Sequence, residues 1–210
     1  NDTLYVGASD GLFRRDSDGV YHAVPEIATR VTALTSVGPG VLVGADDGAY
    51  SVDVQSGRAF QIWTGGPVNA VASARRAAWL GTAAGVVRVD SALGAASTAV
   101  VGPAHVTSIA PSGDDNTLWV GSPSGLVSVD TATCEVSPVP LDRRPVVSLA
   151  PRAGGGVWVG TTTGLGEYGV SGAFRPHDAD VVRDPLVEDS AAHIEYDGDY
   201  IWFSNWSKSV

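Results

Sequence analysis

The sequence lacks methionine altogether and has only one cysteine and one lysine among its 210 residues. A single cysteine, Cys134, excludes an internal disulfide framework and a multi-cysteine metal site, and we expect it to be a small buried apolar residue. No run of 18 apolar residues occurs, so no segment is predicted to span a membrane. Because position 1 is not methionine, we expect a processed product, a fragment or a chain whose natural start has been removed.

No signal peptide is recognisable, but a missing natural start makes this a weak guide to the compartment. The compartment therefore stays open, with the cytoplasm favoured over the cell surface.

Positive charge is scarce as well. The chain has 13 Lys and Arg against 23 Asp and Glu, for a formal net charge of −10, and 18 of the acids are Asp. This balance argues against non-specific binding to nucleic acid or to an anionic membrane, because both need a basic surface. Many Asp, Ala, Val and Gly residues beside one lysine resemble the composition of proteins from halophilic archaea, which favours such a source. A GC-rich genome combined with an acidic surface is the alternative.

A short motif recurs five times along the chain. In each copy a glycine follows an aromatic or aliphatic pair, and a second glycine comes four residues later. The first glycines are Gly7, Gly44, Gly81, Gly121 and Gly160, with spacings of 37, 37, 40 and 39 residues. An aspartate stands nine residues after the first glycine at Asp16, Asp53, Asp90 and Asp130, and Gly169 takes this place in the fifth copy. Self-similarity at this period indicates a repeat architecture.

Each repeat divides into four short runs of strand-forming residues. In residues 106–145 these are VTSIAP, TLWVGS, GLVSVD and EVSPVP, separated by Gly, Asn, Asp and Ser, which suit turns. No stretch shows a capped apolar period of helical length, so no long helix is expected. Four strands in a unit of about 40 residues are typical of a β-propeller blade. The sequence therefore predicts an all-β fold, a β-propeller of four-stranded antiparallel blades.

The repeats predict one domain over residues 1–210. Their expected bounds are 3–30, 31–67, 68–105, 106–145, 146–191 and 192–210, with the first and last repeats incomplete. Five to six blades are therefore visible, and we favour six, with the terminal pieces meeting where the ring closes. Five blades with an extra hairpin and a longer ring trimmed at both ends are the alternatives.

The repeated residues are interpreted as parts of the scaffold. One glycine of each pair permits the tight turn between the second and third strands, and the other lets backbones approach. The repeated aspartate is expected to accept hydrogen bonds from amides in the turn between the third and fourth strands. A set of aromatics at one repeat position is expected to fill the space between blades: Trp79, Trp119, Trp158 and Trp202, with Tyr5 and Leu42 in the matching positions.

The unit LWVGSPSGLVSVD at residues 118–130 resembles the repeat of two-component-regulator β-propellers. That repeat runs aromatic, hydrophobic, Gly, Thr, two variable residues, Gly, hydrophobic, and residues 79–86 and 158–165 are similarly close. The resemblance covers about residues 3–170 and grades into WD-like propellers. It implies a propeller fold and a role as the ligand-sensing extracellular part of a receptor kinase.

Functional residues are expected on loops rather than at repeated positions. We define the predicted ligand face as the connections from the fourth strand of one repeat to the first strand of the next, together with the hairpins between second and third strands. Its candidate ligand-binding or partner-binding residues are Trp63, His105, Arg143, Arg144, His177, Asp178, Asp180 and Arg183.

Two groups within this set have a recognisable chemistry. Arg143 and Arg144 suit a phosphate or carboxylate, and the alternative interpretation is local charge balance. His177, Asp178 and Asp180 suit a divalent cation, and the alternative is a solvated acidic loop.

No nucleophile elbow, phosphate loop, dinucleotide fingerprint or metal-ligand spacing occurs, so no catalytic residue, metal site or cofactor is predicted. The expected function is a non-enzymatic scaffold that binds a protein partner or a small ligand, without nucleic acid and without membrane insertion. The first alternative is a metal-assisted lyase or hydrolase that uses His105 and the segment 177–189 around the central channel. The second is a surface or envelope component glycosylated at Asn205.

Overall fold

The computed structural model describes residues 3–90, 96–100, 102–141, 144–169, 172–177, 193–197 and 200–204. Throughout these residues the chain forms strands and turns and no helix, which confirms the all-β prediction. The described residues therefore contain no helix with the length and apolarity that crossing a membrane requires. The chain divides into two compact units, residues 1–100 and residues 101–210.

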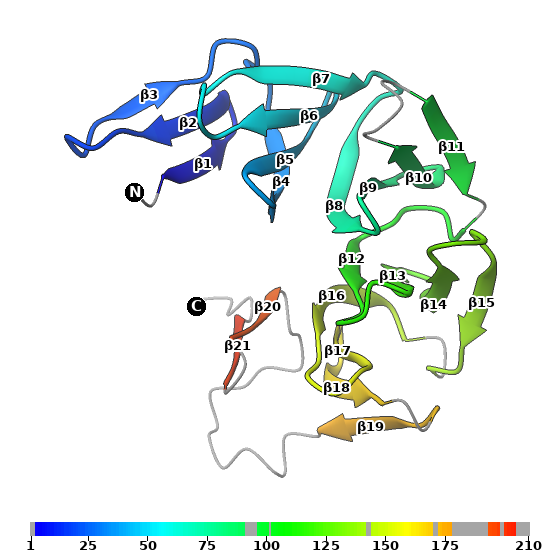
Figure 1. The fold of residues 1–210 in the computed structure, drawn as a ribbon. Coiled ribbons are helices and arrows are strands. Elements are labelled where there is room, and N and C mark those ends of the chain that lie inside the picture. Colours follow the sequence, from blue (N-terminus) through cyan, green and yellow to red (C-terminus); the bar gives the residue numbers. More distant parts are fainter. Residues whose placement is uncertain are drawn as a thin grey trace. The chain divides into compact units, whose positions relative to one another are not determined.

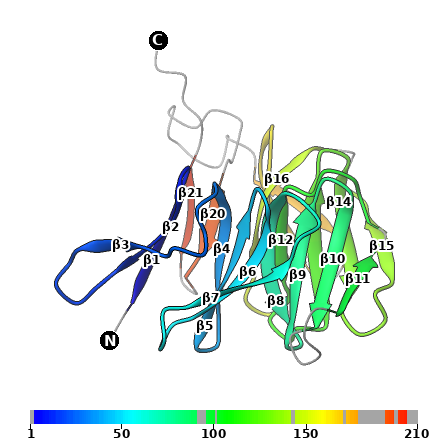
Figure 2. The ribbon, with the colours of Figure 1, turned by 90° about the horizontal axis from the view of Figure 1, so that it is seen from above.

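Unit 1 contains three antiparallel sheets in which strands adjacent in sequence pair with one another (Figure 1). Sheet 1 consists of β1 (Leu4–Ala8), β2 (Gly11–Arg15) and β3 (Tyr21–Ala23). Sheet 2 consists of β4 (Val31–Val37), β5 (Gly40–Ala45), β6 (Gly48–Asp53) and β7 (Ala59–Trp63). Sheet 3 consists of β8 (Val68–Ala74), β9 (Ala77–Thr82), β10 (Gly85–Asp90) and β11 (Ala96–Val100). Figure 2 shows β8, β9 and β10 running side by side in sheet 3.

Unit 2 follows the same plan. Sheet 4 consists of β12 (Ser108–Pro111), β13 (Thr117–Ser122), β14 (Gly125–Asp130) and β15 (Val136–Val139). Sheet 5 consists of β16 (Val146–Pro151), β17 (Val157–Thr161), β18 (Gly164–Tyr168) and β19 (Phe174–His177). Sheet 6 is the pair β20 (His193–Tyr196) and β21 (Ile201–Ser204). Four described sheets thus have the four strands expected of a blade, while the single domain and the blade number stay predictions.

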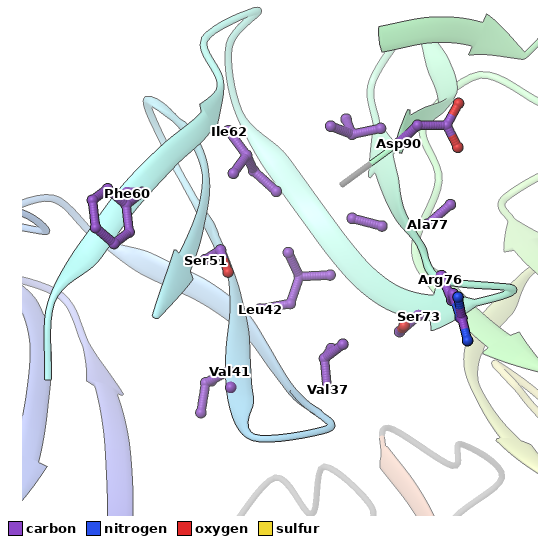
Figure 3. A pocket seen from close by; sticks show the side chains of 13 residues that line it. Val37, Val41, Leu42, Ser51, Phe60, Ile62, Ser73, Arg76, Ala77 and Asp90 are labelled. Carbon is purple, nitrogen blue, oxygen red and sulfur yellow. The ribbon is translucent and has the colours of Figure 1, made fainter. Parts of the chain in front are cut away.

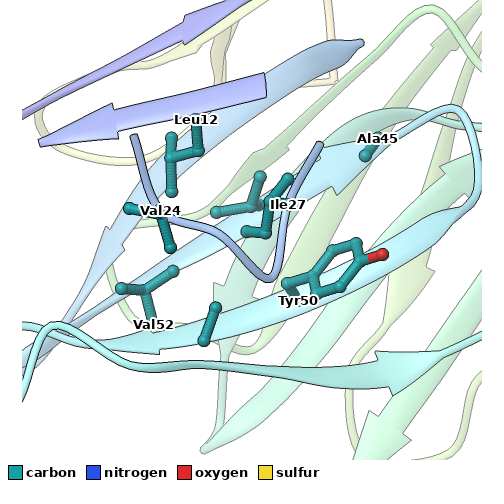
Figure 4. Packing of buried hydrophobic residues seen from close by; sticks show 8 residues of the cluster. Leu12, Val24, Ile27, Ala45, Tyr50 and Val52 are labelled. Atoms are coloured by element: carbon teal, nitrogen blue, oxygen red, sulfur yellow. The ribbon is translucent and has the colours of Figure 1, made fainter. Parts of the chain in front are cut away.

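Apolar side chains fill the space between neighbouring sheets of each unit, and removing this surface from water is the main stabilising term. One cluster joins sheets 1 and 2 (Figure 4): Leu12, Val24, Ile27, Val43, Ala45, Tyr50, Val52 and Ala59. A second joins sheets 2 and 3: Leu42, Ala49, Val68, Val71, Leu80 and Val89. A third joins sheets 4 and 5: Ala110, Leu126, Leu141, Val146, Leu149, Val157 and Val159.

The repeated tryptophans pack against the next sheet at two of the four predicted positions, Trp119 and Trp158, and a third, Trp79, is buried. Trp79 is fully buried, and its indole N–H donates to the carbonyl of Ala74 at 3.3 Å. Trp119 of sheet 4 meets Tyr168 of sheet 5 edge-on, with ring centroids 5.4 Å apart, and Trp158 packs beside the buried Ile194 of sheet 6.

The prediction is wrong at Trp202, which is 63% exposed. Sheet 6 has only two described strands, and the Trp202 indole N–H donates to the carboxylate of Asp197 at 2.9 Å instead of packing between sheets.

The two repeated glycines have the two roles predicted for them. A Cβ on the first glycine would collide with the first valine of the next inner strand, at 2.9 Å between Gly44 and Val68 and at 2.5 Å between Gly121 and Val146. The second glycine, such as Gly125 with φ 122°, adopts a backbone conformation that residues with a Cβ rarely take. The first glycine therefore sets the spacing of neighbouring sheets, and the second permits the hairpin.

A hydroxyl closes the hairpin between second and third strands in three repeats. The Thr82 hydroxyl donates to the carbonyl of Gly85 at 2.9 Å and accepts from the Ala84 N–H at 3.1 Å. Ser122 and Thr161 make the same pair of bonds in their own hairpins. These hydroxyls are buried, so each hairpin is fixed by satisfied polar groups.

The repeated aspartate has the predicted role in two of four copies. Asp53 accepts from the Ser56 N–H at 2.6 Å, and Asp130 accepts from the N–H groups of Ala132 and Thr133 at 2.9 and 2.8 Å. These backbone hydrogen bonds are the main reason that the pKa of Asp53 lies below its ordinary value. The prediction is wrong for Asp16, which forms an ion pair with Arg14, two residues earlier, at 2.7 Å. Asp90 pairs in the same way with Arg88 at 2.8 Å, and the turn that follows it, residues 91–95, lies outside the described residues, so its predicted role there stays a prediction.

Cys134 also differs from expectation. It is half-buried rather than buried, because it lies in the turn between β14 and β15 with a left-handed φ of 61°. Its N–H donates to the carbonyl of Asp130 at 2.8 Å.

The role of the Gly121–Val146 contact in setting the spacing between sheets 4 and 5 can be tested by the substitution Gly121→Ala. The added methyl overpacks the contact with Val146, so the free energy of unfolding should fall by about 1–3 kcal/mol in urea denaturation. Gly113→Ala is the matched control, because no atom lies within 4 Å of the Cβ that it would add. Equal stability of the two variants would contradict the spacing role.

Candidate functional site

The predicted ligand face occupies one end of the sheets in each unit, and Trp63 lies there at the end of β7. Its side chain is half-buried, and its indole covers Gly65, where a Cβ would come within 2.3 Å of the ring. Its carbonyl also approaches Gly48 so closely that a Cβ there would lie 2.1 Å from the oxygen. Trp63 therefore ties the connection after β7 to the hairpin between β5 and β6.

That hairpin carries two aspartates with fixed partners. Arg30, from the connection before β4, donates two hydrogen bonds to Asp46, each at 3.0 Å. Hydrogen bonding to Arg30 lowers the pKa of the Asp46 carboxyl. The Tyr50 hydroxyl donates to Asp47 at 2.8 Å, and the Gln61 amide donates to the Asp47 carbonyl at 3.2 Å. Arg30, Asp46 and Asp47 were not identified as candidates from the sequence. The signal was present there, because two adjacent aspartates stand in a predicted hairpin and an arginine stands in a predicted connection on the same face.

Burial raises the pKa of Tyr50 to about 12, and the hydrogen bond to Asp47 acts in the same direction. The phenol therefore stays protonated and holds the hairpin over the ordinary pH range.

The candidates of unit 2 lie on separate segments. His105 is exposed in the connection before β12 and has a left-handed φ of 56°. Arg144 is half-buried in the connection between β15 and β16, with its guanidinium carbon 6.0 Å from the centroid of the Phe174 ring. Stacking on an aromatic face holds the guanidinium while leaving its N–H groups available in the ring plane.

His177 ends β19 and packs on the indole of Trp158, with ring centroids 5.5 Å apart. The Nε2 atom of His177 and the indole nitrogen of Trp158 are both buried and lack a hydrogen-bond partner within the described part of the chain. His177 is thus held on the scaffold through its ring, and its Nε2 atom is enclosed by it.

Sheet 5 also holds a charged cluster that the sequence analysis missed. Glu167 lies opposite Trp158 across the β17–β18 pair and is only 9% exposed. Arg152 forms an ion pair with it at 2.7 Å and lies 5.9 Å from the Trp158 ring centroid, and Arg175 approaches the second oxygen at 4.0 Å. The sequence carried one signal of this cluster, since Glu167 is a charged residue inside the otherwise uncharged strand GLGEY.

The remaining candidates, Arg143, Asp178, Asp180 and Arg183, lie outside the described residues. Of the four described candidates, Trp63 belongs to unit 1, and His105, Arg144 and His177 belong to unit 2. Within the described ranges, no three His, Cys, Asp or Glu side chains are grouped as metal ligands would be. The cation site suggested by His177 with Asp178 and Asp180 stays a prediction.

Solved structures resemble this chain over almost its whole length. The extracellular domain of the one-component system BT4673 from B. thetaiotaomicron matches 96% of the chain with a TM-score of 0.78 and 21% identity. The computationally designed protein Ika8 matches 96% with a TM-score of 0.75 and 18% identity. Virginiamycin B lyase from Staphylococcus aureus matches 93% with a TM-score of 0.72 and 13% identity.

No protein-family model and no curated protein sequence matches the chain. The chain spans 30% of the BT4673 domain, 64% of Ika8 and 71% of the lyase. At these identities the likeness supports the fold, a β-propeller-like array of antiparallel sheets.

The pKa of Tyr50 gives a pH-dependent prediction. Because its folded pKa of about 12 lies above the ordinary 10.0, its contribution to stability is present below pH 10 and is lost as the pH rises toward 12. We expect the Tm of the unchanged chain to fall more steeply over this range than that of Tyr50→Phe, measured by circular dichroism. Parallel pH profiles of the two proteins would show that the phenol is not coupled to folding.

The Glu167 cluster gives a second prediction. Glu167→Ala removes the acid that Arg152 and Arg175 share, so the free energy of unfolding should fall by about 1–2 kcal/mol, the lower part of the range for charged hydrogen bonds because Arg152 is partly exposed. Glu195→Ala, at an exposed side chain of sheet 6, is the control and should change the Tm little. If Glu167→Ala and Glu195→Ala lower the stability equally, the cluster around Glu167 does not stabilise the fold.

Proposed function

We propose that this chain is a non-enzymatic binding scaffold that holds a protein partner or a small ligand on its predicted ligand face. The observation that carries the proposal is the likeness, over 96% of the chain, to the extracellular domain of a one-component system. A propeller-like array in such a domain suits ligand sensing, and the two-component-regulator resemblance of the repeats points the same way. The proposal implies an extracellular position, which differs from the cytoplasmic one favoured by the sequence.

The construction of the predicted ligand face supports this function. The hydroxyl-closed hairpins at Thr82, Ser122 and Thr161 are rigid, and rigid strand ends allow the adjoining connections to vary without loss of the fold. Arg144 on Phe174 offers a cation from a fixed position, and the His177 ring is fixed on Trp158. Preorganised groups of this kind bind with a smaller loss of side-chain entropy.

We keep one second candidate, a lyase or hydrolase assisted by a metal. The likeness to virginiamycin B lyase favours it, and His177 with Asp178 and Asp180 is the donor set that it would use. Fold likeness alone carries no catalytic residue, so the scaffold ranks first.

Three finer predictions accompany the proposal. A six-bladed ring is supported by the six visible repeats, of which the first and last are incomplete. One domain over residues 1–210 is supported by the continuity of the repeats, and a halophilic archaeal source is supported by the net charge of −10 with a single lysine.

Native mass spectrometry of the untagged, unchelated protein purified from its source cells tests the proposed function. We expect a co-purifying protein in fixed ratio or a small organic molecule of defined mass. Arg144→Ala and His177→Ala should lower its occupancy by about tenfold, as expected for loss of an anchoring side chain. Arg58→Ala, in the turn between β6 and β7 at the other end of the sheet, should leave it unchanged. A bare chain carrying one divalent metal would contradict the scaffold and favour the metal-assisted enzyme.

A further inference from the structure

Unit 1 contains a cavity of about 320 Å³ between sheets 2 and 3 (Figure 3). One wall comes from the end of β4 and from β5, β6 and β7 of sheet 2, and the other comes from β8, β9 and β10 of sheet 3. The lining is mainly apolar, with Leu42, Phe60 and Ile62 on the first wall and Ala78 and Val89 on the second.

The cavity lies at the opposite end of the sheets from the predicted ligand face. It is bordered by the hairpins between β4 and β5 and between β8 and β9, which join first strands to second strands. No candidate residue of the predicted ligand face lines it. A site here is therefore independent of the proposed scaffold function.

An aromatic residue of the repeat is missing at this cavity. The position two residues before the first glycine of the motif is aromatic in four of the five copies: Tyr5, Trp79, Trp119 and Trp158. The second copy carries the aliphatic Leu42 there, and Leu42 lines the cavity. The departure from the repeat and the empty space thus fall at the same place.

Sheets 4 and 5 show how the corresponding space is filled in the other unit. There Trp119 stands at the position of Leu42 and meets the ring of Tyr168 edge-on, with ring centroids 5.4 Å apart. Tyr168 in turn stands at the position of Val89, eight residues after the first glycine of the motif. Two aromatic rings thus occupy, between sheets 4 and 5, the place where Leu42 and Val89 line a cavity between sheets 2 and 3.

Two further side chains leave the space unfilled. Ala78 lines the cavity, whereas Val157, at the same position of sheet 5, is fully buried in the apolar cluster that joins sheets 4 and 5. Phe60 also lines the cavity, but its side chain is 55% exposed and therefore does not fill it. A phenyl ring left largely in water at the margin of an apolar cavity can gain contact area when a ligand enters.

Sheets 2 and 3 cannot approach each other to close this space, because they are already in contact at the first glycine. A Cβ on Gly44 would lie 2.9 Å from Val68, as one on Gly121 would lie 2.5 Å from Val146. The same contact therefore holds both pairs of sheets. Sheets 2 and 3 keep a spacing that suits an aromatic filling but carry smaller side chains, and the walls of the unfilled space lose dispersion contacts.

The charged side chains at the cavity do not select an ion. Arg76 and Asp90 both line it, so both signs of charge are present, and Arg88 donates two hydrogen bonds to the Asp90 carboxylate at 3.1 and 2.8 Å. An uncharged ligand avoids the cost of desolvating an ion against the apolar lining.

We propose that this cavity binds a small, uncharged, planar aromatic molecule the size of indole, in place of the rings that fill the space between sheets 4 and 5. The ring system lies between Leu42 of sheet 2 and Val89 of sheet 3, with its edge toward Phe60. Ser51 and Ser73 also line the cavity, and a serine hydroxyl can accept a hydrogen bond from one N–H or O–H group of the ligand. The volume of about 320 Å³ falls at the small end of the range for ligand pockets, roughly 300–1,000 Å³, so the ligand is a compact molecule rather than a polymer.

Fluorine NMR with two probes of different shape tests the proposal. The probes are 5-fluoroindole and 3-fluoro-1-adamantanol, each titrated into the full chain; both are uncharged and carry one hydrogen-bond donor, but the second is a cage and not a plane. We expect saturable binding of 5-fluoroindole with a Kd below about 1 mM, and binding of the cage weaker by about tenfold, because only the planar probe fits between the two sheets. Failure of 5-fluoroindole to bind up to millimolar concentration, or equal binding of the two probes, would overturn the proposal.

Leu42→Trp supplies the missing ring from the chain itself. Because tryptophan stands at this position in three other copies, the Tm should be maintained or raised, and the affinity for 5-fluoroindole should fall by at least about tenfold as the ring takes its place. Leu4→Trp is the matched control, since Leu4 is 48% exposed on sheet 1 and does not line the cavity, and it should leave the affinity unchanged. Unchanged binding in a folded Leu42→Trp protein, or equal loss in both variants, would place the probe elsewhere and overturn the proposal.

Ala78→Leu fills the cavity from the opposite wall and decides the question if Leu42→Trp does not fold. Leucine stands at this position in sheet 4, where Leu118 is fully buried, so the chain should remain folded. The affinity for 5-fluoroindole should fall by about tenfold, because the added side chain occupies part of the space. Full affinity in a folded Ala78→Leu protein would contradict binding between the two sheets, and the comparison of the two probes remains decisive if neither variant folds.

Discussion

The contact between the first glycine of one repeat and the leading valine of the next inner strand governs how sheets stack within each unit. At Gly7, Gly44 and Gly121 an added Cβ would lie 2.5, 2.9 and 2.5 Å from that valine. Hydrogen bonds fix the same approach, since the hydroxyls of Thr32 and Thr107 donate to the carbonyls of Val68 and Val146. Once this spacing is set, the buried apolar clusters have a defined width to fill, and close packing follows.

The repeat period and its turn residues predicted the four-stranded sheets because both are local properties of the chain. The partner of the repeated aspartate also depends on the residue that stands two positions before it. Where serine stands two residues earlier, at Ser51 and Ser128, the carboxylate turns to the backbone amides. Where arginine stands there, at Arg14 and Arg88, side chains two apart lie on the same face of the strand and the arginine captures the carboxylate.

The candidate site was predictable as a set of loops and not as a set of contacts. His177 and Arg144 were identified because they depart from the repeat, but their partners Trp158 and Phe174 come from strands far away in the sequence. Glu167 departs from the repeat as well, and it was not recognised. A departure acquires meaning only when the side chains opposite it are known, because a nearly buried carboxylate is stabilised only if cations such as Arg152 and Arg175 reach it.

Backbone strain in the described residues is concentrated in turns that lack glycine. The hairpins closed by Gly125 and its counterparts use glycine where φ is positive, so they store little strain. Five residues with full side chains adopt positive φ, at a cost of about 1–3 kcal/mol each: Arg75, Arg76, His105, Asp115 and Cys134. Such conformations persist only where the surrounding structure fixes them. Hydrogen bonds do so at two of these turns, since the Cys134 N–H donates to the carbonyl of Asp130 at 2.8 Å and the Asp115 N–H donates to the carbonyl of Ser112 at 3.0 Å. The paired strands on either side of each turn therefore hold a backbone that the turn sequence alone disfavours.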